Sequence, residues 1–189
     1  MSPQRPTRVW VAFLRGVNVG GHHAVRMASL RAVFTEAGYD RVRTVRASGN
    51  LLFAAAPSVP APEPELLGAA LERALGYPVG VYLRSAEHLA ALVRRDPFGS
   101  PRPEPWTPYV TFLDRPARGV ARVPLRSPLG HIEAFAVRGA DVFSWCRPAG
   151  GRPGFPNEFL EGALGRTATT RNWSTVRALV EAAAPRTER

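Results

Sequence analysis

The stretch VWVAFLRGVNVGG, from Val9 to Gly21, joins an apolar run to a glycine-rich segment. Val9 to Leu14 contains no polar residue and does not alternate between apolar and polar positions. A run of this kind predicts a β-strand that is buried on both faces. The rest of the chain must therefore supply a protein layer on each side of this strand.

The segments that follow predict the order strand, helix, strand, strand, helix, strand. Apolar residues recur at helical spacing from Met27 to Ala37 and from Glu65 to Leu75. The other predicted strands are Val42–Ala47, Leu51–Ala54 and Val79–Leu83. This is the order of the ferredoxin-like βαββαβ unit, whose central strands are the first and the third. We therefore expect an α+β protein with a ferredoxin-like subdomain over residues 1–95.

The second half of the chain predicts a smaller α+β subdomain over residues 96–184, packed on the open face of the first sheet. We expect helices at residues 85–95, beginning with a capping serine, and at 157–164 and 170–183; strands are expected at 109–113, 131–137 and 141–146. Residues 185–189 are expected to form a disordered tail.

The charge of the chain is strongly positive, at +10 formal charges over 189 residues. Lysine is absent, so all 25 basic residues are arginines. They are scattered along the chain, whereas a nucleic-acid arm carries its basic residues in runs. Without lysine, a Walker loop, a pyridoxal phosphate Schiff base and a protein-kinase site are excluded in their usual forms.

The single cysteine, Cys146, excludes an internal disulfide. The first apolar run stops at Arg15, which is too early for the core of a signal peptide. No segment reaches the ~20 apolar residues of a membrane span. We therefore expect a cytoplasmic protein with no membrane partner.

Three segments, VAFLRGVNVGG, VRTVRASGNLLF and ATTRNWSTVRAL, occur in this order from residue 11 to residue 179. Together they resemble the bacterial domain-of-unknown-function family numbered sixteen ninety-seven, and the likeness runs from about Arg8 to about Ala182. The resemblance implies a two-part α+β protein with a ferredoxin-like N-terminal half, and it implies no established activity.

The chain departs from that family at one place. Members often carry Gly-x-Gly-x-Ser-Lys-Leu before the short C-terminal helix, where this chain reads GGRPGF with Pro153 and Gly154 in the Ser and Lys positions. If the lysine holds a phosphate or does chemistry in relatives, this chain has lost that function. Arg152 would supply a cation only from a different place.

The predicted topology suggests a ligand site. The segment after Leu14 and the turn before Leu51 should meet at one sheet edge, because the first and third strands run antiparallel. A helix beginning near Thr170 would add backbone N–H groups that favour anions. The candidate ligand-binding residues are Arg15, Asn18, Gly20, Ser48, Asn50, Thr170, Arg171 and Asn172. They predict a small anionic, phosphate-bearing ligand bound between the two halves.

Two alternatives remain open. Diffuse arginine charge could bind nucleic acid, in which case binding would weaken steeply with salt. Alternatively, the polar cluster could be purely structural, so that replacing Arg15 or Asn50 would cost roughly 1–3 kcal/mol for each buried group left unpaired.

No catalytic constellation or cofactor motif is visible, so we expect no cofactor, and an enzyme is not favoured. His22 and His23 are adjacent and point apart, and no second ligand cluster exists, so no metal site is predicted. His131 and Glu133 lie on one face of a predicted strand, either as an acid–base pair or as exposed decoration. Cys146 is expected to be a small core residue.

Overall fold

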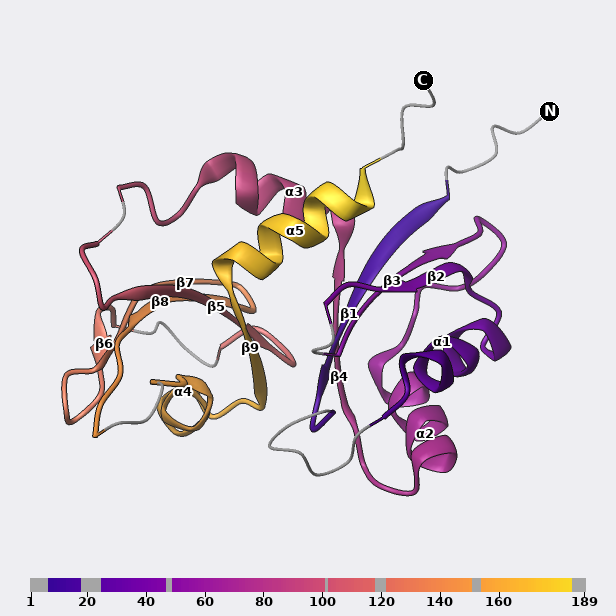
Figure 1. Ribbon diagram of the computed structural model, residues 1–189, viewed down its shortest axis with the longest axis horizontal. Coiled ribbons are helices and arrows are strands. Elements are labelled where there is room, and N and C mark those ends of the chain that lie inside the picture. The colour runs from indigo at the N-terminus through magenta and orange to yellow at the C-terminus, as the bar shows by residue number, and fades with distance from the viewer. Residues whose placement is uncertain are drawn as a thin grey trace. The chain divides into compact units, whose positions relative to one another are not determined.

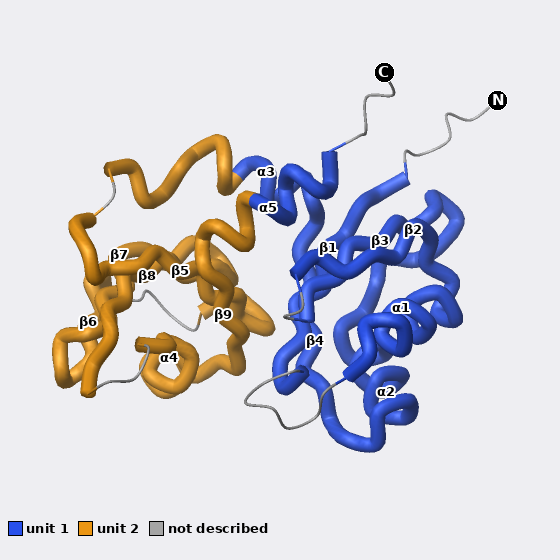
Figure 2. The backbone as a smooth tube through the Cα atoms, in the orientation of Figure 1, with its two compact units in different colours: residues 1–91, 178–189 blue, residues 92–177 orange. Residues whose placement is uncertain are grey.

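The structure is a computed structural model, and it describes residues 7–17, 25–46, 49–100, 102–117, 122–150 and 154–184. The chain forms two compact units (Figure 2). Unit 1 comprises residues 1–91 and 178–189, and unit 2 comprises residues 92–177. Both units combine helices with an antiparallel sheet, so the protein belongs to the α+β class.

Unit 1 is built on a four-stranded antiparallel sheet with the order β2-β3-β1-β4 (Figure 1). Its strands are β1 (Arg8–Arg15), β2 (Asp40–Thr44), β3 (Asn50–Ala55) and β4 (Gly80–Ser85), and its first two helices are α1 (Met27–Glu36) and α2 (Pro64–Leu75). Every residue of β3 is buried. The prediction that the first and third strands are central is confirmed.

The core of unit 1 lies between the sheet and the helices α1 and α2. Ala12 and Leu14 of β1 belong to this core together with buried residues of both helices. Phe34 of α1 packs on Phe53 of β3 with 5.1 Å between the ring centroids. Burying a side chain of this size contributes about 1.5–3 kcal/mol. After α1, Gly38 takes the positive φ of 86° that turns the chain into β2.

The last helix of the chain contributes to both units. This helix, α5 (Trp173–Ala183), belongs to unit 1 from Ala178 onward. In β2, Arg43 donates a hydrogen bond to the carbonyl oxygen of Ala182. The helix α3 (Ala86–Arg95) also crosses the boundary between the units. It begins at the predicted cap, where Ser85 Oγ accepts a hydrogen bond from the backbone N–H of His88 at 3.1 Å.

Unit 2 contains a five-stranded antiparallel sheet with the order β6-β7-β8-β5-β9. Its strands are β5 (Thr107–Leu113), β6 (Leu125–Arg126), β7 (Ile132–Arg138), β8 (Asp141–Cys146) and β9 (Ala168–Asn172), and the helix α4 is Asn157–Leu164. Leu160 and Leu164 of α4 pack against the sheet. A turn at Gly139 joins β7 to β8.

One predicted helix start is wrong. The helix expected from Thr170 begins at Trp173, and the preceding residues form β9. The β-branched pair Thr169 and Thr170 adds a strand beside β5, which satisfies backbone groups that an isolated first helical turn would leave open. The helical spacing of apolar residues after Trp173 correctly predicted a helix, but this spacing does not show where the helix begins. The predicted tail, residues 185–189, lies outside the described residues.

Candidate functional site

The meeting of the β1 end with the turn before β3 is confirmed within unit 1. Phe13 lies opposite Asn50, and the backbone N–H of Leu14 donates to the carbonyl oxygen of Gly49 at 2.7 Å. Gly49 has a φ of 66°, and a Cβ there would lie 3.2 Å from the Leu14 carbonyl oxygen. Only glycine fits this approach without strain. Asn18, Gly20 and Ser48 lie outside the described residues.

Asn50 serves the turn in which it lies. Its side chain is fully buried, and its Nδ2 donates to the carbonyl oxygen of Val45 at 3.2 Å. The backbone N–H of Val45 donates in return to the carbonyl oxygen of Asn50 at 3.0 Å. These two bonds close the turn and account for an asparagine here without a ligand.

Arg15 lies at the exposed end of β1, opposite Gly80 of β4. A Cβ on Gly80 would lie 3.3 Å from the Cβ of Arg15, so the arginine side chain passes over the glycine. A residue larger than glycine at position 80 would displace the Arg15 side chain. The glycine therefore helps to set the direction of the Arg15 side chain.

In unit 2, the strand β9 separates the predicted site residues onto two faces. Side chains alternate along a strand, so Arg171 lies on one face of the sheet and Thr170 and Asn172 lie on the other. Thr170 Oγ1 shares a hydrogen bond with Thr111 Oγ1 at 2.7 Å in the buried interior. Asn172 Oδ1 accepts a hydrogen bond from the backbone N–H of Ser174 at 2.9 Å and caps α5.

Arg171 is held by its own strand. Its guanidinium donates to Thr169 Oγ1 at 2.8 Å and to the carbonyl oxygen of Thr170 at 2.9 Å. Burial lowers the pKa of Arg171 to about 10, which still leaves the side chain protonated at neutral pH. Arg171 is therefore a half-buried cation that donates to hydroxyl and carbonyl oxygens of its own strand.

The polar face of β5, β8 and β9 contains Tyr109, Cys146 and Asn172. Burial raises the pKa of Tyr109; the thiolate form of Cys146 would raise this pKa further, and a hydrogen bond with Asn172 lowers it. Burial also raises the pKa of Cys146 to about 11, although a hydrogen bond to Ser144 opposes it. The thiol is thus protonated at neutral pH, and its expected place in the core is confirmed.

A group of arginine and tryptophan side chains on unit 2 was not predicted. We call it the Arg–Trp cluster; its members are Arg102, Trp106, Arg126, Glu133, Trp145 and Arg147. Strand pairing explains it, because residues directly opposite each other share a face. Glu133 of β7 lies opposite both Trp145 and Arg126. Arg147 follows two residues after Trp145 and so returns to the same face.

Stacking holds the arginines of the cluster in place. The guanidinium carbon of Arg102 lies 5.2 Å from the ring centroid of Trp106 and 5.5 Å from that of Trp145. The guanidinium carbon of Arg147 lies 5.2 Å from the ring centroid of Trp106. Cation–π contacts of this kind are worth about 0.5–1 kcal/mol at exposed sites, and they restrict where the cation points.

Glu133 is the carboxylate of the cluster. It pairs with Arg102, and its Oε2 accepts a hydrogen bond from Arg126 Nε at 3.1 Å. Its hydrogen bond with Arg102 is the largest of the influences that together lower its pKa, so the carboxylate is ionised at neutral pH. His131 instead bonds with Ser127, at 3.1 Å between Nδ1 and Oγ. Glu133 is thus a partner for arginines and is poorly suited to act as a general acid or base.

The cluster carries an excess of positive charge, because it contains three guanidiniums and one carboxylate, and that carboxylate pairs with Arg102 and Arg126. Arg126 and Arg147 are exposed. Within the described residues, no carboxylate pairs with Arg147. The sequence signal was the alternation His131–Glu133 and Trp145–Arg147. This alternation does not reveal the cluster from the sequence alone. The strand pairing and the path of the loop before β5 are what bring these residues beside Arg102 and Trp106.

Neither a metal site nor a membrane span is found in the described part of the chain. No three His, Cys, Asp or Glu side chains gather there as metal ligands would. The described helices also lack the combined length and hydrophobicity needed to cross a bilayer.

The two units give this chain an α+β fold. Residues 8–143 match the family described as Protein of unknown function (DUF1697), and the chain belongs to that family. No curated protein matches the chain.

A solved structure has a similar fold. It is that of a conserved bacterial protein from Streptococcus pneumoniae, which is 18% identical in sequence with a TM-score of 0.59. The match covers 93% of this chain and 98% of the other. At this identity the similarity supports the fold alone.

Proposed function

We propose that unit 2 binds a small phosphate-bearing anion at the Arg–Trp cluster. The observation that carries the proposal is the exposed Arg147, which Trp106 holds in place and which has no carboxylate partner among the described residues. It lies in a cluster that contains three guanidiniums and one carboxylate. A phosphate dianion would balance the two excess positive charges.

The chemistry of arginine suits this ligand. A guanidinium presents a planar fork of N–H donors that matches two phosphate oxygens at once. Because Arg147 already lies against the Trp106 ring, it would lose less conformational freedom on binding than a mobile side chain. Arg126 has a side chain that is 65% exposed, so it keeps donors for the ligand while its Nε bonds Glu133.

This proposal differs from the site predicted from the sequence. Asn50, Thr170 and Asn172 each have a structural partner, which favours structural roles for them. A shared ligand of Arg15 and Arg171 stays a prediction.

Isothermal titration calorimetry with inorganic phosphate and with AMP tests the proposal. We expect saturable binding that Arg147→Ala weakens about tenfold, since a hydrogen bond to a charged group is worth about 1.5–3 kcal/mol. Arg94→Ala removes an exposed arginine of α3 outside the cluster and should bind as the wild type does. Equal weakening by both variants would show diffuse charge only, and the absence of binding to either probe would overturn the proposal.

Single-stranded nucleic acid is the second candidate, because arginines beside tryptophans are typical of surfaces on which bases stack. The ring of Trp106 is already contacted by two guanidiniums, so a base would have to displace one of them. A fluorescent oligonucleotide distinguishes the two ligands. If nucleic acid binds, its association constant should fall steeply with salt, with a slope set by the number of phosphates contacted.

A further inference from the structure

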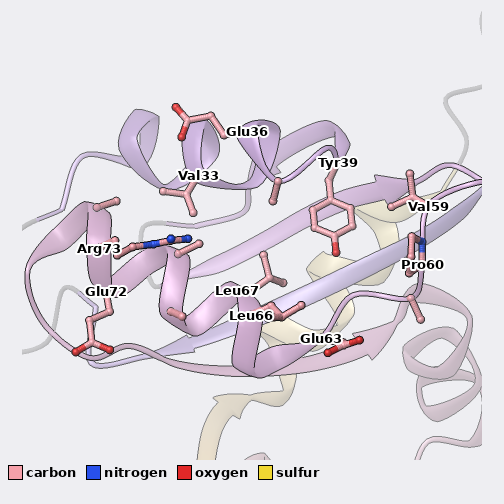
Figure 3. Close-up of a pocket in the computed structure, with 15 residues that line it drawn as sticks. Val33, Glu36, Tyr39, Val59, Pro60, Glu63, Leu66, Leu67, Glu72 and Arg73 are labelled. Atoms are coloured by element: carbon pink, nitrogen blue, oxygen red, sulfur yellow. The ribbon is translucent and has the colours of Figure 1, made fainter.

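A groove runs between α1 and α2 on unit 1 (Figure 3). We call it the α1–α2 groove; it is lined by these two helices and by the loop before α2, and its volume is about 980 Å³. Three of its lining residues, Val33, Tyr39 and Leu67, belong to the core of unit 1, and it shares no residue with the Arg–Trp cluster.

The floor of the groove is apolar and partly open to solvent. Leu66 of α2 lines it with 66% of its surface exposed, although its neighbour Leu67 is buried in the core. Ala70 and Ala74 follow on the same helix, and their small side chains leave room for an incoming chain. Exposed apolar surface that is rimmed by charged groups is typical of a binding surface.

The rim of the groove is acidic. Glu36, Glu63 and Glu72 line it together with one cation, Arg73, which leaves two negative charges. This balance is opposite in sign to the +10 of the whole chain. Figure 3 shows Glu36 on the α1 side and Glu72 on the α2 side, with the Arg73 side chain between the two helices.

The negative charge of Glu63 acts on Tyr39 inside the groove. Tyr39 lines the groove, with its hydroxyl pointing toward α2 in Figure 3. Burial raises the pKa of Tyr39, and the negative charge of Glu63 raises it further. A cation that enters beside Tyr39 would therefore meet a negative potential.

We propose that the α1–α2 groove binds a cationic amphipathic segment of a protein partner, with its apolar side chains on Leu66 and its arginines or lysines on the glutamates. The α2 residues that line the groove run from Leu66 to Ala74, about 12 Å of helix, so the groove matches about two helical turns. This is the helix-in-groove mode of recognition. Nucleic acid is a poor occupant, because the acidic rim repels phosphates.

The test uses the full chain and a fluorescein-labelled helical probe peptide with leucines at positions i, i+4 and i+7 and arginines on both flanks. Fluorescence anisotropy should show saturable binding that weakens with salt. Glu63→Gln with Glu72→Gln should weaken it about fivefold, as two exposed ion pairs would. Leu66→Ser should weaken it as well. Glu87→Gln alters an exposed glutamate of α3 outside the groove and should bind as the wild type does.

Three results would overturn the proposal. One is unchanged binding in the Glu63/Glu72 double variant with intact circular dichroism. A second is equal binding of a control peptide whose arginines are replaced by glutamates. The third is self-association in sedimentation equilibrium that Leu66→Ser abolishes, because the occupant would then be a second copy of this chain. Binding of the probe by Arg147→Ala should equal that of the wild type, which keeps this test separate from that of the Arg–Trp cluster.

Discussion

Asn50 donates a hydrogen bond from Nδ2 back across its turn to the carbonyl oxygen of Val45, at 3.2 Å, from a fully buried position. The bond ties the end of β2 to the beginning of β3. Asn50, which the sequence suggests as a ligand-binding residue, thus has a structural partner within unit 1.

Replacing Asn50 should therefore reduce stability. We expect Asn50→Ala to lower the free energy of unfolding by about 1–3 kcal/mol, because the carbonyl oxygen of Val45 loses a donor in a buried place. Urea denaturation followed by circular dichroism measures the effect. Ser58→Ala, at an exposed loop position, is the control and should change the midpoint little. A stable Asn50→Ala variant would favour a ligand-binding role instead.

The Thr111–Thr170 hydroxyl pair supports a second prediction. Thr111→Val should cost about 1–2 kcal/mol, since it leaves the hydroxyl of Thr170 buried without its partner. The double variant Thr111→Val/Thr170→Val should cost less than the sum of the two single changes, because it removes both polar groups together. A double-mutant cycle from denaturation curves measures this coupling. Strict additivity would contradict a bond between the two hydroxyls.

Glu133 should make stability depend on acid pH. Its pKa in the folded protein is lowered from its ordinary value of 4.5, so unfolding binds a proton as the pH falls. Its contribution is fully present above pH 4.5 and disappears as the pH drops through the lowered folded value. We expect Glu133→Gln to cost about 1 kcal/mol at pH 7, the upper end for partly exposed ion pairs.

The measurement compares unfolding midpoints of the wild type and Glu133→Gln between pH 7 and pH 3. The two curves should converge toward the acid end. Parallel curves would show that the pairs with Arg102 and Arg126 contribute no stability.

Cys146 should resist alkylation in the folded protein. Its thiol is buried and its pKa is raised to about 11, so thiolate is scarce at pH 7.5. We expect iodoacetamide to modify the native protein at least about a hundredfold more slowly than the protein in urea, since only the exposed thiolate reacts. Mass spectrometry gives the rate directly, because the chain has one cysteine. Rapid modification of the native protein would place the thiol in an open site.

The sequence predicted the framework of unit 1 well, because its information is local or periodic. The apolar run before Arg15 identified a central strand, and Ser85 marked a helix start. The β6 strand escaped prediction because its two residues are too few to show a period. The helix start at Trp173 was misplaced because pairing with β5, a tertiary event, converted Thr169 and Thr170 into strand.

The candidate site was harder to predict for the same reason. Arg171 and Asn172 are adjacent in the sequence, and the prediction assigned them to one pocket. Alternation along β9 places their side chains on opposite faces of the sheet, whereas the prediction placed both residues at the start of a helix. Conversely, Arg102 and Glu133 lie 31 positions apart and pair only after β7, β8 and the loop before β5 have come together.

The division of α5 between the two units has a consequence for the order of synthesis. Unit 2 has all its residues once position 177 has been translated, whereas unit 1 still lacks those from Ala178 onward. The N-terminal sheet must therefore leave the ribosome before the helix end that Arg43 contacts has been made. A chain truncated within α5 would contain every strand of both sheets and still lack the segment that completes the first unit.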